Sequence, residues 1–188
     1  MSKIVNEPKY KFRILQAIRG TLEHRATWLY LMVDEARKRG LDFSEVGNEA
    51  VFRCGTAQGA DLVRKGNTSS LKGLKKTLFT TPARLVFEMK VIESTDDRLS
   101  VDFHYCPLVK AWQDQGCSDE EIVTLCDIAM SGDRGIAKAY GARLDLPQTI
   151  SRGASHCQIR FVKDPEAAAA EHAQSIEGGR ASSGRGRA

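Results

Sequence analysis

The sequence of 188 residues lacks any long apolar run. No stretch approaches the ~18 to 20 consecutive apolar residues that a membrane-spanning helix requires, and the first 30 residues contain no apolar core typical of a secretory signal. Only 7% of the residues are aromatic, and no run of lysine and arginine alternates with them, which argues against a dedicated nucleic-acid surface. We therefore expect a soluble, cytoplasmic protein that binds neither nucleic acid nor membranes.

Two further patterns are missing. No glycine-rich phosphate loop interrupts a strand-to-helix turn, so nucleotide-binding α/β folds lose support. The five cysteines include no CxxC pair, and their spacing fits none of the compact zinc-finger patterns. In a cytoplasmic chain such cysteines are free thiols, metal ligands or nucleophiles before they are disulfides.

The composition that remains is that of an ordinary globular domain. The chain is 41% hydrophobic and 28% charged, and its length suits one domain with a real core. We expect that domain to cover residues 1–163. Residues 164–188 are expected to form a partly disordered tail: an alanine-rich piece could be helical, and the Gly/Ser/Arg run that follows it cannot bury enough surface to become ordered.

The first half of the chain shows helical periodicity. Apolar residues at three- and four-residue spacings predict a long helix over 9–38 and a second one over 43–62. Glycines 47, 55 and 59 weaken the second helix, and we interpret them as sites where another helix or a ligand packs closely against the backbone. A short basic amphipathic helix, LKGLKKTLF, follows.

The second half mixes alternating and helical patterns. Pro107 can start a helix, and Ser118 with Glu121 forms a capping box that starts a long helix ending near Tyr140. Alternation predicts four strands, at 83–93, 99–105, 142–150 and 156–162. The order of elements predicts an α+β fold, a single domain in which helices pack on one side of an antiparallel sheet.

Several side chains with reactive groups fall within these elements. His104 and Cys106 are two residues apart on one predicted strand and should project from the same face, either as a site or as a buried histidine beside a small thiol. Cys126 and Asp133 are seven residues apart, so they share one face of the capped helix. A buried carboxylate such as Asp133 must meet a cation, a donor or a water-filled cleft.

The last predicted strand carries two more candidates. His156 and Cys157 are adjacent and point to opposite faces of the sheet, so only one of them can join His104 and Cys106. Cys157 shares its face with Ile159 and Phe161, which places it on the core side. We therefore assign Cys157 to the candidate site.

Three segments together resemble a known family. They are FHYCPLVKAWQDQG, LCDIAMSGDRGIAKAYG and LDLPQTISRGASHCQIRF, in which Cys106 precedes Pro107, Cys126 precedes Asp133 on a helix, and Gly153 precedes Cys157. In these features the chain is similar to the L-2-amino-thiazoline-4-carboxylic acid hydrolase family. The resemblance implies hydrolytic opening of a five-membered cyclic amidine in a small-molecule substrate.

Two mechanisms fit this resemblance. In the first, Cys106 is a nucleophile activated by His104, with Asp133 orienting a base or the substrate, while Cys126, Cys157 and Arg152 bind the substrate. In the second, a divalent metal such as zinc or manganese activates water, and Asp133 is the general base. The candidate metal ligands are His104, Cys106, Cys126 and Cys157.

One other function stays open at this point. The same cysteines could line the pocket of a non-catalytic module that binds a small ligand or a metal. The sequence is also compatible with a homo-oligomer.

Overall fold

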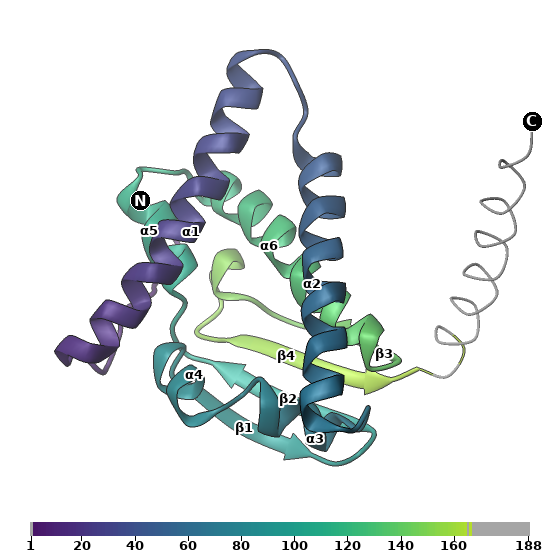
Figure 1. Ribbon diagram of the computed structural model, residues 1–188. Coiled ribbons are helices and arrows are strands. Elements are labelled where there is room, and N and C mark those ends of the chain that lie inside the picture. Colours follow the sequence, from purple (N-terminus) through teal and green to yellow (C-terminus); the bar gives the residue numbers. More distant parts are fainter. Residues whose placement is uncertain (1, 165, 167–188) are drawn as a thin grey trace, which may run out of the picture.

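A four-stranded antiparallel sheet forms the centre of the computed structural model, which describes residues 2–164 and 166 (Figure 1). Each strand pairs antiparallel with its neighbours, in the order β1-β2-β4-β3. The strands are β1 (Met89–Ser94), β2 (Arg98–Phe103), β3 (Ala142–Asp145) and β4 (Cys157–Lys163). The α+β fold predicted from the sequence is confirmed.

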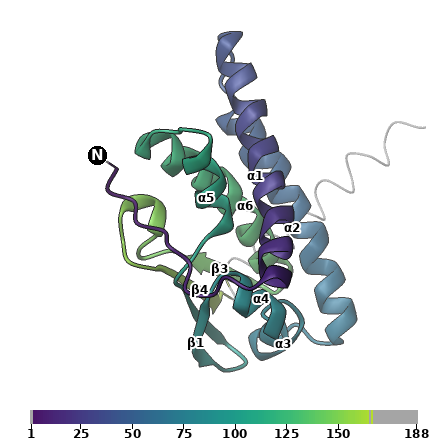
Figure 2. The same ribbon diagram turned by 90° about the vertical axis from the view of Figure 1, so that its left-hand side faces the viewer.

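Six α-helices and one 3-10 turn complete the described chain. They are α1 (Arg13–Lys38), α2 (Ser44–Gly66), α3 (Leu71–Thr77), α4 (Thr81–Val86), α5 (Pro107–Asp114), α6 (Asp119–Ala139) and η1 (Ile150–Arg152). Figure 2 shows that α1 and α2 run along one side of the molecule. Helices α5 and α6 lie next to α1, toward the opposite side. The capping box is present, because Ser118 Oγ accepts from Glu121 N–H and the Glu121 carboxylate accepts from Ser118 N–H.

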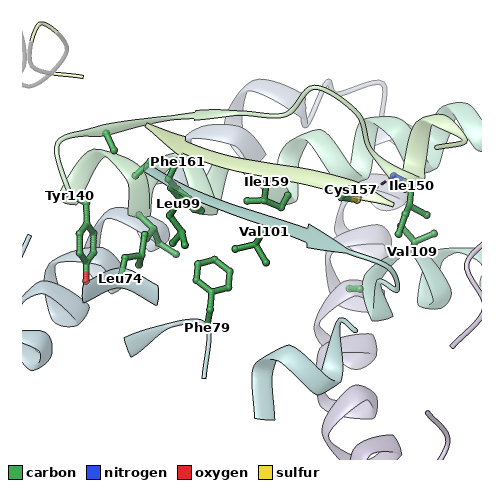
Figure 3. Packing of buried hydrophobic residues seen from close by; sticks show 14 of the residues in the cluster. Leu74, Phe79, Leu99, Val101, Val109, Tyr140, Ile150, Cys157, Ile159 and Phe161 are labelled. Carbon is green, nitrogen blue, oxygen red and sulfur yellow. Dashed lines mark hydrogen bonds between the residues drawn. The ribbon is translucent and has the colours of Figure 1, made fainter. Parts of the chain in front are cut away.

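The core lies on one face of the sheet. Leu99 and Val101 of β2 pair with Phe161 and Ile159 of β4, and all four side chains are at most 2% exposed (Figure 3). Burying each such side chain stabilises the fold by about 1.5 to 3 kcal/mol. Cys157, the first residue of β4, continues this buried face, which places its thiol at the edge of the core.

The contact between α2 and α6 depends on glycines. A Cβ atom at Gly55 would lie 1.9 Å from the carbonyl oxygen of Gly132, and one at Gly135 would lie 2.2 Å from that of Phe52. No side chain fits there, so the two backbones touch directly. Of the two roles considered for these glycines, helix-helix contact is the one observed.

Two strand predictions are wrong in part. Residues 81–86 form helix α4 instead of the start of a strand, because Pro82 occupies its first turn, where a proline needs no N–H partner. The strand predicted over 142–150 ends at Asp145, and the chain then turns into η1.

A buried ion pair fixes the start of β1. Glu88 adopts a left-handed backbone conformation (φ 50°), and its carboxylate lies 3.0 Å from the Arg19 guanidinium of α1. Both side chains are almost fully buried, and Glu88 also accepts from the N–H groups of Lys9 and Tyr10. The pair therefore joins α1 to the sheet.

Two expectations concern other parts of the chain. The predicted tail, apart from residues 164 and 166, lies outside the described residues. Within the described part, none of the helices combines the length and the apolar composition needed to cross a lipid bilayer.

The glycine contact predicts the effect of adding a methyl group. Gly55→Ala should destabilise the protein by about 1 to 3 kcal/mol or more, because the new Cβ collides with backbone that cannot rotate away. Gly20→Ala in α1 is the control, since its Cβ meets nothing within 4 Å and should stabilise the helix by about 0.5 to 1 kcal/mol. Chemical denaturation measures both changes, and a stable Gly55→Ala protein would contradict the packing described.

Candidate functional site

Three cysteines from distant parts of the sequence gather at one end of the sheet. Cys106 lies between β2 and α5, Cys126 lies on α6, and Cys157 begins β4. The three thiols are neighbours. Cys126 and Cys157 both raise the pKa of Cys106, and Cys126 also raises the pKa of Cys157. We call these residues the three-cysteine cluster.

The connection between β3 and β4 covers this cluster. The Ile150 N–H of η1 donates to Cys157 Sγ over 3.2 Å, and the next residue, Ser151, is hydrogen-bonded to Cys126. Figure 3 shows Cys157 beside Ile150 and Val109. The turn therefore holds two of the three sulfur atoms.

The N-terminal segment fixes the backbone of the third cysteine. Asn6 is 4% exposed; its Nδ2 donates to the Cys106 carbonyl (2.8 Å), and its Oδ1 accepts from the Cys106 N–H (2.9 Å). One amide side chain thus satisfies both backbone groups of Cys106. Asn6 was not predicted from the sequence, because nothing local marks so distant a contact.

Burial raises the pKa of all three thiols. It raises the pKa of Cys157 to about 12, against the opposing effect of the Ile150 N–H. It also raises the pKa of Cys106, where the neighbouring sulfur atoms add to the effect, and the pKa of Cys126, where the Ser151 hydrogen bond acts in the opposite direction. All three side chains are therefore neutral thiols at pH 7 in the free protein.

His104 does not join these cysteines. Strand β2 ends at Phe103, earlier than predicted, so the alternation that would align His104 with Cys106 is interrupted. The His104 ring instead stacks on His156, with 5.2 Å between ring centroids. Burial and His156 lower the pKa of His104, and no hydrogen bond within residues 2–164 links it to Cys106.

His156 belongs to a polar cluster on the other face of the sheet. Its Nε2 lies 3.7 Å from Asp102 Oδ2, and Arg160 donates to Asp102 Oδ1 over 2.6 Å. The opposite orientation of His156 and Cys157 agrees with the sequence prediction. The pair predicted between His104 and Cys106, in contrast, is not formed.

The candidate metal ligands are not arranged as a metal site. Among the residues that the structure describes, no group of three or more His, Cys, Asp or Glu side chains is placed to hold a metal ion. His104 stacks on His156, apart from the three thiols, so the predicted set of four ligands does not converge.

A small cavity lies between α6 and η1. Its volume is about 140 Å³, and it opens beside a wider cleft of about 580 Å³ that includes Ser2, Lys3 and the start of α6. We call the smaller cavity the α6–η1 pocket. It is lined by Val123, Cys126, Asp127, Met130, Arg134, Leu146, Thr149, Ser151 and Arg152.

The α6–η1 pocket contains both signs of charge. Arg134 Nη2 donates to Asp127 Oδ1 over 2.8 Å, which fixes one carboxylate and one guanidinium at the wall. Arg152 also lines the pocket, and within the described residues its side chain has no hydrogen bond or ion pair. A bound anion could therefore engage Arg152 without breaking an existing contact.

The sequence prediction identified this pocket only in part. Cys126 and Arg152, predicted to bind the substrate, both line it. Asp127, Arg134 and Ser151 were missed, although the seven-residue spacing of Asp127 and Arg134 on one helix could have indicated the pair. Cys106, Cys157 and Asp133 line neither cavity.

Asp133 is half-buried on α6, and its carboxylate forms no ion pair within the described part of the chain. Burial raises the pKa of its carboxyl to about 6, although Arg25 and Arg134 exert an opposing influence. The carboxyl therefore titrates near neutral pH, and its environment favours the protonated form.

The shifted pKa of Asp133 predicts a pH-dependent stability. The pKa of Asp133 is higher in the folded than in the unfolded state. Its carboxyl therefore does not lower the free energy of unfolding at low pH, but lowers it progressively as the pH rises from about 4 through 6. Asp133→Asn should therefore leave stability unchanged near pH 4 and raise it by at most about 3 kcal/mol at pH 7. Denaturant titrations at both pH values test this, with Asp127→Asn as a control on the same helix. An equal effect of Asp133→Asn at both pH values would contradict the assignment.

The raised thiol pKa values predict slow alkylation. Cys54 is exposed on α2 and should react with iodoacetamide at pH 7 at least ~100-fold faster than the three-cysteine cluster, whose thiolate fraction is small. Peptide mass spectrometry of samples labelled for increasing times measures each rate. Rapid labelling of Cys106 would show that its thiol is ionised in the folded protein.

Comparison with known proteins places the chain in a family. The model of the L-2-amino-thiazoline-4-carboxylic acid hydrolase family matches residues 19–161, which include all three cysteines and the α6–η1 pocket. No curated protein gives a significant match. A trafficking protein particle complex subunit 3 from Naegleria fowleri, solved covalently bound to palmitic acid, is similar over 76% of this chain and 94% of its own, with 13% identity and a TM-score of 0.48. That similarity is too low to carry an inference, whereas the family match spans most of the chain. This chain belongs to the L-2-amino-thiazoline-4-carboxylic acid hydrolase family.

Proposed function

We propose that the protein is a hydrolase that opens a small cyclic amidine bearing a carboxylate, and that it does so in the α6–η1 pocket. The observation that carries this proposal is the presence of a thiol, a carboxylate and two guanidinium groups around one cavity of about 140 Å³. The family name agrees with a hydrolase acting on a 2-amino-thiazoline-4-carboxylate ring.

The charges of the pocket complement such a substrate. The substrate carboxylate pairs with Arg152, whose guanidinium has no other partner among the described residues. The amidine lies toward Asp127, whose carboxylate stabilises the positive charge that develops as the amidine nitrogen takes up the thiol proton. This orientation directs the carbon between ring nitrogen and sulfur toward Cys126.

Cys126 is the proposed nucleophile, in place of Cys106, because it lines the pocket and Cys106 does not. Its sulfur adds to the amidine carbon, and the thiol proton moves to the ring nitrogen. The ring C–N bond then breaks, and the nitrogen leaves as an amine with a proton from the exocyclic amino group. Water adds to the same carbon, and the Cys126 thiol leaves with a proton from the added hydroxyl, so the net reaction consumes one water.

This route is compatible with the raised pKa of Cys126. A neutral thiol needs a base, and the basic nitrogen of the neutral amidine can accept the proton directly. Ser151, hydrogen-bonded to Cys126, stabilises the developing charge on sulfur. No step requires His104, which lies with His156 at the polar cluster.

A non-catalytic binding module is the second candidate. The observation that favours it is that burial keeps all three thiols protonated, which suits a pocket that binds without reacting. Binding of 2-amino-thiazoline-4-carboxylate with no release of ring-opened product would support this alternative.

Substitutions in the pocket test the hydrolase. Cys126→Ser should lower kcat by at least ~100-fold, because a hydroxyl is a far weaker nucleophile, while the exposed Cys54→Ser should leave kcat unchanged. Cys106→Ser should retain measurable turnover, since this thiol lies outside the pocket. The assay measures the amine released from 2-amino-thiazoline-4-carboxylate, with circular dichroism confirming that each variant is folded. Full activity of Cys126→Ser would refute the proposed nucleophile.

Arg152 is tested by pairing a variant with a truncated substrate. Arg152→Gln should raise KM for the carboxylate substrate by about 10-fold or more and leave kcat nearly unchanged. The unsubstituted 2-amino-thiazoline, which lacks the carboxylate, should be turned over equally by both proteins. If Arg152→Gln impaired both substrates alike, Arg152 would not be the carboxylate partner.

A further inference from the structure

Two buried hydroxyl groups line the α6–η1 pocket beside Cys126. Thr149 is 6% exposed and Ser151 is 2% exposed, and their hydroxyl oxygens lie 2.9 Å apart. Ser151 is in turn hydrogen-bonded to Cys126. The side chains of Thr149, Ser151 and Cys126 therefore form one row, which ends at the sulfur atom.

The hydroxyl of Thr149 does not have the role that its place in the chain would ordinarily give it. Thr149 is the N-cap of η1, with an extended backbone. A threonine at such a position commonly accepts a hydrogen bond from a backbone N–H of the turn that follows, but the Thr149 side chain accepts none. Its hydroxyl bonds to Ser151 instead, so capping of the turn does not explain this side chain.

The direction of the two hydrogen bonds follows from the number of protons. A serine hydroxyl has one proton and two lone pairs. Burial raises the pKa of Cys126, and the hydrogen bond with Ser151 acts in the opposite direction, which means that Ser151 donates its proton to the sulfur as the thiol ionises. The Ser151 oxygen then offers only lone pairs, so Thr149 is the donor in the bond between the two hydroxyls.

The backbone of the η1 turn holds Thr149 in place. The Thr149 carbonyl accepts from the N–H groups of Arg152 (3.1 Å) and Ala154 (3.2 Å). Ile150, which lies between the two hydroxyl-bearing residues, is fully buried, and its N–H donates to Cys157 Sγ (Figure 3). The donor at residue 149 is therefore fixed by the turn, whereas a serine hydroxyl without such a partner rotates freely.

We propose that Thr149 is a positioning residue, whose hydroxyl holds that of Ser151 so that the Ser151 O–H points at the Cys126 sulfur. This inference rests on the proposed function, in which negative charge develops on that sulfur as it adds to the substrate. Hydrogen bonds in a row polarise one another, so a donor that itself accepts a hydrogen bond is the stronger donor. Without Thr149, the Ser151 hydroxyl can turn and accept from the Cys126 thiol, which favours the protonated form.

Alkylation of Cys126 measures the effect without turnover. With iodoacetamide at pH 8, where the rate follows the thiolate fraction, Ser151→Ala should lower the rate at Cys126 by about 10-fold or more, and Thr149→Val by about threefold or more. Thr149→Ala, which also lacks the hydroxyl, is the second variant and should show the same change. Thr149→Ser keeps a hydroxyl and should stay close to the unmodified protein. The exposed Cys54 is the internal standard in every sample.

The matched control is Thr77→Val. Thr77 is a partly buried threonine of α3 whose hydroxyl donates to the backbone carbonyls of Gly73 and Leu74, and it lines neither cavity. None of these substitutions changes the titratable and charged groups that face Cys126. They are Asp127, Asp133, Arg152, Cys106 and Cys157. A shift in the pH dependence of alkylation therefore reports on the hydroxyl pair.

Turnover separates this inference from the hydrolase proposal. With 2-amino-thiazoline-4-carboxylate, Thr149→Val should lower kcat by about threefold or more and leave KM within about twofold, because Arg152 and Asp127 still bind the substrate. Slower alkylation in Thr149→Val, with no turnover even by the unmodified protein, would overturn the hydrolase and support the positioning of the sulfur. Equal alkylation rates in Thr149→Val, Thr77→Val and the unmodified protein would overturn the role of Thr149, whatever the turnover.

Discussion

The direct backbone contact between α2 and α6 is the constraint on which the rest of the structure depends. Gly55 meets Gly132, and Gly135 meets Phe52, at distances that exclude even a methyl group. Because this contact fixes α6 on one side, the opposite side of the same helix has a defined position over the sheet. This position of α6 places three of its residues in the α6–η1 pocket: Cys126, Asp127 and Arg134.

The sheet separates two groups of reactive side chains. On its core face, β4 places Cys157 beside the other two thiols, where burial keeps them protonated. On its polar face, Asp102 joins His156 and Arg160, with His104 stacked on His156. This separation explains why a histidine close to Cys106 in sequence has no part in the proposed reaction.

The sequence predicted elements best where the signal was local. The helix started by Ser118 and Glu121 was predicted correctly because a capping box involves only neighbouring residues. The segment after Pro82 was misread because its alternation of apolar and polar residues resembles a strand, while its proline and tertiary contacts form a helical turn. Local patterns could not reveal that Asn6 holds the backbone of Cys106.

Prediction of the candidate site from the sequence was limited in the same way. Spacing placed Cys126 on the inward side of its helix and Cys157 on the core face of its strand. It could not indicate which thiol faces a cavity, because that depends on how the η1 turn lies over α6. Nor could it show that β2 ends before His104.

The most direct test of the proposed chemistry is to trap the covalent intermediate. Rapid acid quenching during the first turnover of 2-amino-thiazoline-4-carboxylate, followed by peptide mass spectrometry, shows which residue carries the ring-opened substrate. The account predicts an adduct on the peptide that contains Cys126, and none on that peptide in Cys126→Ser. An adduct on Cys106 would contradict it.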